Sequence, residues 1–485
     1  MSHIETHIEE LPWAAPHELF HAFADEPFAL LLDSATAAPG RDPALHGRWS
    51  FIAREPYDTL VLRAGDGRDP FATLKERLAR LQPAASPSLP PFAGGAAGFF
   101  GYDLAHALEK LPPRDRPFAI DDRNLPDMAV GFYDTVLAFD HLEGRAFTVS
   151  TGRPGESTQA RMARAASRAA EWRERISAAR NELRPEAAPG ATVIAANFTR
   201  EEYERAVARV IDYIRAGDIF QANLAQRFDA PLAGGDTPYA LYLRLRRRSP
   251  APFASFFNFG AGALVSSSPE RFLACREGAV ETKPIKGTRP RGPTPAEDAR
   301  LAAELLASEK DRAENVMIVD LLRNDVSRVC ADGTVTVEKL CALESFSHVH
   351  HLVSTVKGRL APGMTSVDLL AAAFPGGSIT GAPKLRAMEI IAELEPTTRG
   401  PYCGAIGYIG FDGGMDTSIA IRTMIVQGER VSFQAGGGIT ADSDPAAEYE
   451  ETLAKARAMM DALGAGGDSP DATDGERPRL AEAGA

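Results

Sequence analysis

The chain has 485 residues, of which 44% are hydrophobic and 25% charged, a composition typical of a globular protein with two or three domains or one large elaborated domain. Its net charge of −13 argues against nucleic acid as a partner, and its four widely separated cysteines argue against a zinc site or a disulfide framework. Because the sequence shows neither a secretory leader nor an apolar run of membrane length, we expect a cytoplasmic protein that does not bind membranes.

The N-terminal region, residues 1–190, is expected to contain strands and one long helix. Residues 51–54 and 59–63 are strand-like and lie between turns rich in proline and glycine. Residues 155–183 contain good helix formers and few breakers, which predicts a surface helix. Residues 185–192 then have the composition of a linker, so we place a boundary near residue 190.

The second region, residues 191–463, begins with a predicted helix and a predicted strand. Thr199 precedes two glutamates and is a typical helix cap, and the helical pattern continues to Arg215. Residues 219–228 alternate apolar and polar side chains, as a strand with one wet face does. Gln221 could therefore face a pocket or solvent, and the alternation alone favours solvent. The tail, residues 464–485, is expected to be disordered because it is rich in glycine, aspartate, alanine and proline.

The sequence of residues 281–292 predicts a short basic loop that carries Lys286. Pro284 and Gly287 mark a turn that would hold Lys286 in a restricted conformation beside Lys283, Arg289 and Arg291. Neighbouring cations penalise a protonated amine, so the pKa of Lys286 would fall and its neutral, nucleophilic form would be favoured. A solvated basic turn is the alternative. Upstream, Glu270 directly follows a proline at a probable strand junction.

Two predicted helices carry pairs of carboxylates. Residues 295–324 have helical spacing, as one long or broken helix, and place Asp311 and Glu314 on one face. Asp444 and Pro445 predict the start of a second helix, on which Glu448, Glu451 and Lys455 form one stripe. Hard oxygen ligands of this kind suit Mg²⁺. The alternative is that each pair lies on a solvated helix face.

Glycine-rich turns and one arginine suggest an anionic ligand. Residues 376–381 have the glycine spacing of a phosphate loop, but Ala382 and Pro383 stand where lysine and serine or threonine are required, which excludes that motif. Arg422 interrupts an apolar strand-like segment, residues 417–426. A guanidinium in such a segment needs an anionic partner, either a protein carboxylate or a ligand.

Several motifs between residues 199 and 463 together resemble the chorismate-utilising enzymes, and within them the aminodeoxychorismate synthase branch. They are Q-A-N-L-A-Q-R-F, S-P-E-R-F, P-I-K-G-T, F-P-G-G-S-I-T-G-A-P-K, A-I-R-T and A-E-Y-E-E-T. The resemblance implies an α+β fold of two large antiparallel β-sheets flanked by helices, with the N-terminal region woven into it. That region matches more loosely at residues 30–35 and 47–52. Asp33 stands where feedback-controlled relatives have glutamate, so tryptophan inhibition is not expected.

The same resemblance implies a role for each candidate site residue. Lys286 would be a nucleophile that attacks carbon 2 of chorismate, Glu270 would protonate the departing hydroxyl, and His351 would be the pocket histidine. Mg²⁺ would be held by Glu314 and Glu451, with Glu448 and Asp311 in support. Substrate would be bound by Arg422, Lys455, Tyr402, Gly436, Gly437, Gly438, Gln221 and Thr380.

The identity of residue 286 distinguishes between two possible reaction products. Lysine in P-I-K-G-T favours amination at carbon 4, giving 4-amino-4-deoxychorismate for p-aminobenzoate and folate synthesis. Anthranilate synthases usually have alanine there, and their reaction, amination at carbon 2 with loss of pyruvate, is the main alternative. No glutaminase module is evident, so the resemblance implies ammonia from a separate glutamine amidotransferase subunit in a heterodimer. A non-catalytic chorismate-binding protein and a magnesium-dependent phosphoryl transferase are weaker alternatives.

Overall fold

The computed structural model describes residues 6–37, 42, 47–63, 66–79, 89–112, 120–179, 192–346 and 349–464. The expected tail from residue 465 and all but the last residue of the expected linker lie outside this part of the chain. The strands are β1 His7–Leu11, β2 Leu30–Asp33, β3 Trp49–Ala53, β4 Asp58–Leu62, β5 Gly95–Phe100, β6 Met128–Tyr133, β7 Thr135–Asp140, β8 Arg145–Ser150, β9 Ala195–Ala196, β10 Gln221–Pro231, β11 Phe253–Asn258, β12 Ala263–Ser268, β13 Arg271–Arg276, β14 Ala279–Thr282, β15 Ile285–Pro290, β16 Thr336–Ser345, β17 Val349–Arg359, β18 Gly381–Ala382, β19 Ala405–Gly410, β20 Met415–Ile419, β21 Thr423–Gln427 and β22 Arg430–Ile439. The helices are α1 Pro16–Leu19, α3 Pro70–Ala79, α4 Thr158–Ala179, α5 Arg200–Arg215, α6 Pro238–Arg248, α7 Pro295–Ala307, α8 Glu309–Ser327, α9 Ser366–Ala373, α10 Lys384–Leu394 and α11 Pro445–Ala462, with short 3₁₀ turns η1 Phe20–Phe23, η2 Tyr102–Ala107 and η3 Gly377–Ile379.

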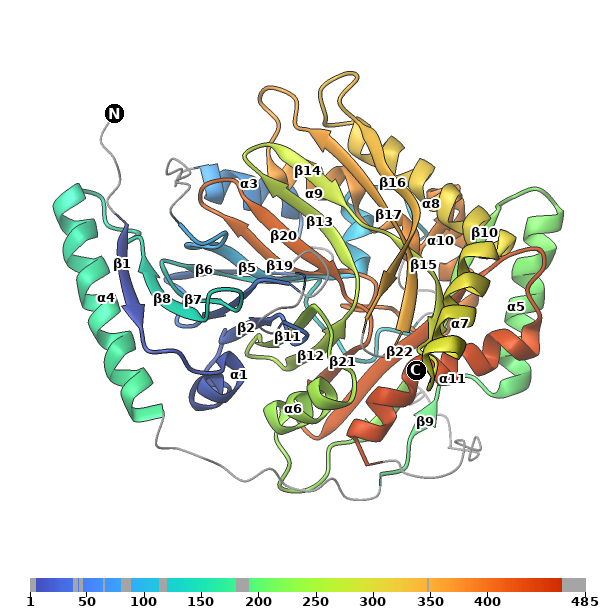
Figure 1. Cartoon of the computed structure of the whole chain (residues 1–485), viewed down its shortest axis with the longest axis horizontal. Helices are drawn as coiled ribbons and strands as arrows, with labels where there is room; N and C mark the ends of the chain where they lie inside the picture. The colour runs from blue at the N-terminus through green and yellow to red at the C-terminus, as the bar shows by residue number, and fades with distance from the viewer. Residues whose placement is uncertain are drawn as a thin grey trace, which may run out of the picture.

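Two large sheets form the centre of the molecule (Figure 1). The first has the strand order β1-β8-β7-β3-β2-β11-β12-β21-β22-β10-β18, with β9 beside β10. The second has the order β15-β17-β14-β13-β20-β19-β5-β6-β4, with β16 beside β17. Neighbouring strands pair antiparallel, as Leu224 does with Gly437 and Gly98 with Gly407. The predicted fold class, two antiparallel sheets flanked by helices, is confirmed.

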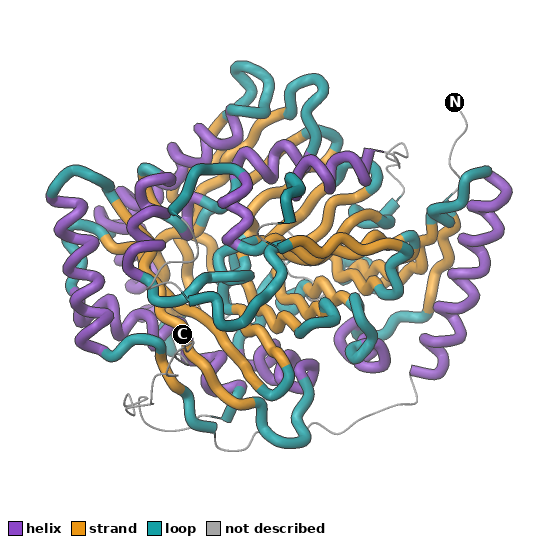
Figure 2. Tube along the Cα trace, turned by 180° about the vertical axis from the view of Figure 1, so that it is seen from behind, coloured by secondary structure: helices purple, strands orange, loops and turns teal. Residues whose placement is uncertain are grey.

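Three hydrophobic clusters define the layers. One lies between the sheets and joins Phe51 and Leu264 of the first sheet to Phe99 and Tyr408 of the second. A second cluster packs α4, α5, α6 and α11 against the outer face of the first sheet, and a third packs α3, α8 and α9 against the second sheet. Figure 2 shows the helices around the periphery and the strands within. Burial on this scale is the main stabilising contribution in such a fold.

Both sheets contain strands from both regions predicted from the sequence. In the first sheet β2 pairs with β11, and in the second β5 pairs with β19. The described residues before 180 and after 191 therefore share one layered body, and the boundary near residue 190 divides the sequence without dividing the sheets.

Several local predictions can be compared directly with the structure. Thr199 caps α5 in a capping box with Glu202, and Asp444 caps α11, as predicted. The helix predicted over residues 295–324 is broken at Ser308, which caps α8. The wet face assigned to residues 219–228 is wrong: Gln221 is only 1% exposed, because β10 packs into a hydrophobic cluster on each of its faces.

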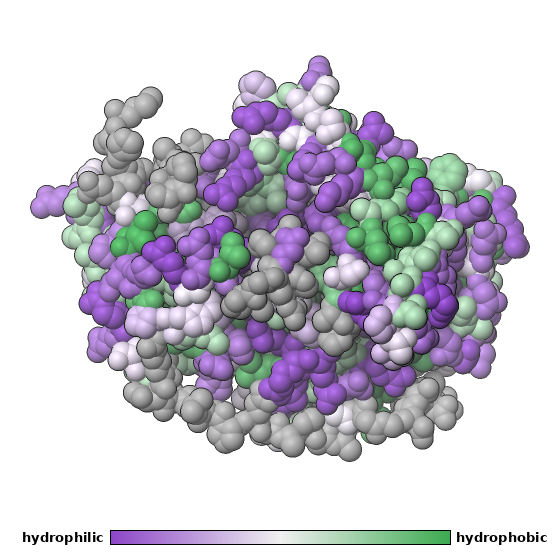
Figure 3. Space-filling view, viewed as in Figure 1, coloured by the Kyte–Doolittle hydropathy of each residue, from purple (hydrophilic) through white to green (hydrophobic). Residues whose placement is uncertain are grey.

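The visible surface is mixed in character. Figure 3 shows hydrophilic residues over much of one face, with hydrophobic residues gathered toward the right of the view. Among the described residues, no helix is both long and apolar enough to cross a membrane.

Candidate active site

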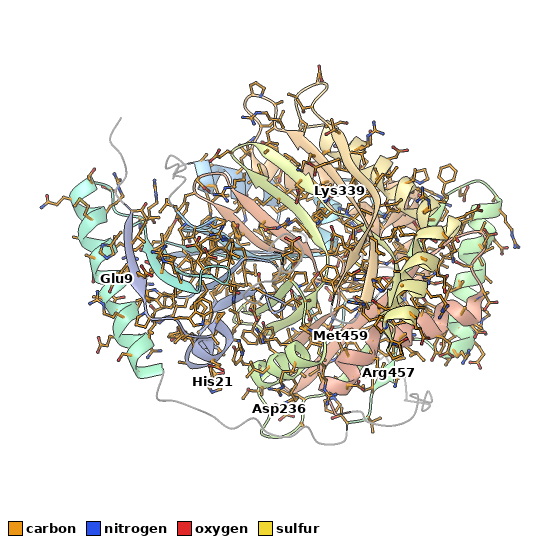
Figure 4. All side chains as sticks on the ribbon, in the orientation of Figure 1. Glu9, His21, Asp236, Lys339, Arg457 and Met459 are labelled. Carbon is orange, nitrogen blue, oxygen red and sulfur yellow. The ribbon has the colours of Figure 1, made fainter. Side chains whose placement is uncertain are left out.

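A cavity of about 610 Å³ lies where the two sheets meet α8 and α11. Its walls come from β10, β15, β17, η3, β22 and the segment between β20 and β21. Met459, labelled on α11 in Figure 4, lines it. All the predicted site residues line this cavity except Gln221, Thr380 and Gly437.

Lys286 lies in β15 and not on the predicted loop. The strand has an irregularity between Ile285 and Thr288, where Gly287 has a φ of +83°, and this bulge places Lys286 in the cavity wall. A Cβ built on Gly438 would lie 3.3 Å from Nζ, so the glycine leaves the amine room. No hydrogen bond or ion pair from Nζ to a protein group is found within the described ranges.

The cations expected to lower the pKa of Lys286 do not surround it. Lys283 pairs with Glu344, Arg289 with Glu304 and Asp311, and Arg291 with Asp298. Burial is the main cause that lowers the pKa of Lys286, and the ammonium of Lys455 adds to it, while Glu314 opposes both. The predicted direction is therefore retained, but its physical cause is different.

Glu270 lies in the loop between β12 and β13 and is 6% exposed. The hydroxyl of Ser378 donates a hydrogen bond of 2.7 Å to Oε1. Burial raises the pKa of Glu270 to about 7, against the opposing effects of Ser378 and Lys286. This carboxyl can hold a proton near neutral pH, which a general acid requires.

His351 is buried in β17, next to β15. Its Nδ1 lies 2.9 Å from Oγ1 of Thr288. Burial, followed by the charge of Arg422, lowers the pKa of His351 to about 4. The imidazole is therefore neutral near neutral pH and offers the cavity a polar group without a charge.

The four predicted metal ligands lie on the two helices that border the cavity. Burial raises the pKa of Glu314 on α8 and of Glu448 on α11, although Ser443 donates a 2.6 Å hydrogen bond to Glu448. Burial also acts on Glu451, but the ammonium of Lys455, 2.6 Å from Oε1, lowers its pKa overall. Asp311 forms an ion pair of 3.2 Å with Arg289.

These carboxylates fit a magnesium ion that keeps water or substrate ligands. Glu448 and Glu451 both face Gly437, where a built Cβ would lie 2.8 Å from Oε2 of Glu448 and 3.5 Å from Oε1 of Glu451. Asp311 and Glu451 add to the raised pKa of Glu314, which a cation would relieve. Within the described ranges no group of three or more acidic, histidine or cysteine side chains is arranged to hold a metal ion. Mg²⁺ commonly binds through only one or two carboxylates.

Two cations and one phenol also line the cavity. Arg422 has a φ of +52°, and this turn between β20 and β21 directs it to the cavity, where its guanidinium has no hydrogen bond to another described group. Lys455 donates a 2.8 Å hydrogen bond to the carbonyl of Gly436. Tyr402 is buried, and its pKa is raised by that burial. The two cations can bind a dicarboxylate ligand.

Three predicted substrate ligands do not line the cavity. Thr380 is fully buried, and its hydroxyl donates to the carbonyl of Gly376 at 3.0 Å, so it is not presented to a ligand. Gln221 is buried against Gly438, and a Cβ on that glycine would clash with its amide. Gly437 lies between Gly436 and Gly438, which do line the cavity, and faces the two glutamates.

Some functional candidates were missed from the sequence. Lys310 and Ser378 line the cavity, as does Asn223, which lies in the strand whose polar side chains were expected to face solvent. Below the cavity Arg399 is 2% exposed and pairs with Glu395 at 2.6 Å. It also donates to the carbonyls of Asn223 at 2.6 Å and Ile379 at 3.1 Å, so it joins two cavity walls. The one sequence feature that could have suggested the role of Arg399 is its position next to a glycine-rich turn, and this feature is only weakly diagnostic.

A second cavity of about 390 Å³ lies between the N-terminal strands and β13, β19 and β20. Asp33 lines it and accepts hydrogen bonds from Tyr242 at 2.8 Å and Arg246 at 2.6 Å. Its carboxylate is therefore already paired with protein donors.

The model of the chorismate binding enzyme family matches residues 30–461, which include every predicted site residue. The chain belongs to this family. It is therefore an enzyme that acts on chorismate.

Relatives come from two branches of the family. The chain is 44% identical to aminodeoxychorismate synthase component 1 of Klebsiella aerogenes, over 93% of this chain and 98% of the relative. It is 46% identical to anthranilate synthase component 1 of Thermus thermophilus, over 86% and 87% of the two chains. The crystal structure of anthranilate synthase component I from Streptococcus pneumoniae superposes with a TM-score of 0.74 and 35% identity, covering 85% of this chain and 92% of that one. Overall identity does not separate the two activities.

Proposed function

We propose that this family member aminates chorismate at carbon 4 and releases 4-amino-4-deoxychorismate, the reaction of an aminodeoxychorismate synthase component 1. The observation that carries the proposal is the position of Lys286, which lines the cavity with a lowered pKa and no protein partner among the described residues. A neutral amine there can act as a nucleophile. The motif P-I-K-G-T supplies this lysine, whereas the P-I-A-G-T typical of anthranilate synthases does not.

The reaction consists of two displacements. Nζ of Lys286 bonds to ring carbon 2, the ring double bonds shift, and the bond between carbon 4 and its hydroxyl breaks. Glu270 gives its proton to that hydroxyl, which leaves as water. Ammonia then bonds to carbon 4, the double bonds shift back, and Lys286 departs from carbon 2. The amines release the proton that restores Glu270, so chorismate and ammonia yield aminodeoxychorismate and water.

The remaining cavity residues bind and orient the substrate. Arg422 and Lys455 would pair with the substrate carboxylates, and the neutral His351 would contribute a hydrogen bond. Glu314 and Glu451 would hold Mg²⁺, supported by Glu448 and Asp311. When bound, the ion would neutralise the carboxylates around it and help to fix a substrate carboxylate.

The ammonia would come from a glutamine amidotransferase subunit. The relatives above are named component 1, which is consistent with a second subunit in those enzymes. Free ammonium should replace this subunit in vitro, as the proposed chemistry needs only ammonia.

Product identification tests the proposal. Purified protein is supplied with chorismate, ammonium and Mg²⁺, and the products are separated by liquid chromatography and mass spectrometry. We expect aminodeoxychorismate, with the pyruvyl group still on the ring. Coupling to lactate dehydrogenase and NADH measures any pyruvate. Anthranilate and stoichiometric pyruvate would instead identify an anthranilate synthase.

A further inference from the structure

A serine hydroxyl holds one oxygen of the buried Glu270 carboxyl. Oγ of Ser378 lies 2.7 Å from Oε1 and donates to it. Ser378 belongs to η3, which is remote in sequence from the strand junction that carries Glu270. Both residues line the cavity, and Ser378 is partly accessible from it. The hydrogen bond therefore links the η3 turn to the loop that carries Glu270, the proposed general acid.

Packing fixes the turn that carries Ser378. A Cβ on Gly377 would lie 2.6 Å from Leu321, and one on Gly376 would lie 2.8 Å from Ile419, so the turn is pressed against the core. Thr380 donates to the carbonyl of Gly376 at 3.0 Å. The hydroxyl of Ser378 is thus held in place by backbone that has little room to move.

We infer that Ser378 is a positioning residue that occupies Oε1 of Glu270 and thereby leaves the carboxyl proton on Oε2, the oxygen that delivers it to the substrate. This inference rests on the proposed function, in which Glu270 is the general acid. The inference also assigns the glycine-rich turn a role other than anion binding, because the close packing of the turn holds Ser378 against Glu270.

The chemistry follows from the number of protons available. A serine hydroxyl has one proton to donate, and a neutral carboxyl has one as well. With the hydroxyl proton directed at Oε1, the carboxyl proton resides on Oε2. When that proton moves to the leaving hydroxyl, the remaining carboxylate keeps the Ser378 hydrogen bond, which is stronger to a charged acceptor.

Other groups also shift the pKa of Glu270, so the effect of Ser378 must be measured with those groups unchanged. Lys286 of β15 and Lys455 of α11 both act to lower this pKa, and so does a hydrogen bond from the backbone of Ile285. The thiol of Cys403 also interacts with it. None of these groups changes when Ser378 alone is substituted.

The test is Ser378→Ala, compared with Ser378→Thr, which keeps a hydroxyl. We expect the alanine variant to lose about 10- to 100-fold in kcat, a part of what a general acid contributes. The pH at which activity falls on the alkaline side should rise, because loss of a donor to the carboxylate favours the protonated acid. The threonine variant should recover both properties. Ser150→Ala, which removes a buried 2.8 Å hydrogen bond to Thr135 in the first sheet, is the matched control and should match the wild type.

Circular dichroism establishes that each variant folds, and Ser378→Cys replaces the alanine variant if that variant does not. Unchanged kcat and pH dependence in the alanine variant would overturn the inference, as would equal losses in the alanine and threonine variants. Glu270→Gln, measured in parallel, separates the two levels of the argument. An inactive Glu270→Gln beside an unaffected Ser378→Ala refutes only the positioning role, whereas a fully active Glu270→Gln refutes the acid role and the inference with it.

Discussion

Replacing Arg399 with methionine should destabilise the protein more than the same replacement of an arginine in a solvent-exposed ion pair. The guanidinium is 2% exposed, and it donates two hydrogen bonds to Glu395 and one each to the carbonyls of Asn223 and Ile379. Methionine preserves volume but leaves Glu395 as a buried charge without its cation. Breaking a buried pair in this way costs about 3–5 kcal/mol, so we expect a loss of about 4 kcal/mol in the free energy of unfolding.

Urea unfolding followed by circular dichroism measures this loss. Arg386→Met is the matched control on α10, because Arg386 pairs with Asp218 at 2.9 Å while 37% exposed, and we expect it to cost less than about 1 kcal/mol. The double variant Glu395→Gln with Arg399→Met leaves no unpaired charge and should recover part of the loss. A cost for Arg399→Met equal to that of the control would refute the reasoning.

Three further predictions concern activity. Lys286→Ala should abolish aminodeoxychorismate formation even with saturating ammonium, and turnover at the wild-type rate would exclude the covalent role. The value of kcat/KM should fall as pH rises through about 7, because Glu270 then loses its proton. Glu270→Gln should lose most of its activity, and any residual activity should lack this limb; a wild-type profile that stays flat across neutral pH would contradict the assignment. Glu451→Gln should raise the Mg²⁺ concentration for half-maximal activity by more than about tenfold, whereas Glu450→Gln, an exposed neighbour that pairs with Arg200, should not; calorimetric titration with Mg²⁺ and chorismate checks the same difference without turnover.

Local sequence signals predicted the helices better than the strands. The caps at Thr199 and Asp444 are short-range features, so their helices begin where expected. The burial of a strand depends on segments that are distant in the sequence and pack against it in the fold. Gln221 is polar at an alternating position, yet both faces of β10 are packed, with Leu224 in one hydrophobic cluster and Ala225 in another, so the amide is buried. Alternation alone could not reveal this second covering layer.

Most of the predicted site residues line one cavity, but the physical cause expected for the lowered pKa of Lys286 was wrong. The motifs identified Lys286, Glu270 and the carboxylates because the residue types are diagnostic, and the cavity brings them together. The sequence neighbours of Lys286 suggested the wrong cations, since each of those neighbours pairs with a carboxylate brought to it by the fold. The cation that contributes is Lys455, which arrives from α11 at the other end of this region of the chain.

Each sheet contains strands from both regions of the chain, and this arrangement affects how the chain folds. Leu31 pairs with Phe256 in one sheet and Gly98 with Gly407 in the other, so neither sheet is complete until distant segments meet. Such long-range pairing slows folding and leaves strand edges exposed meanwhile. A polypeptide cut within residues 180–191 would yield two fragments, each with unpaired β-strand edges that are complementary to those of the other. Co-expression of the two fragments should therefore restore a layered enzyme that neither fragment forms alone.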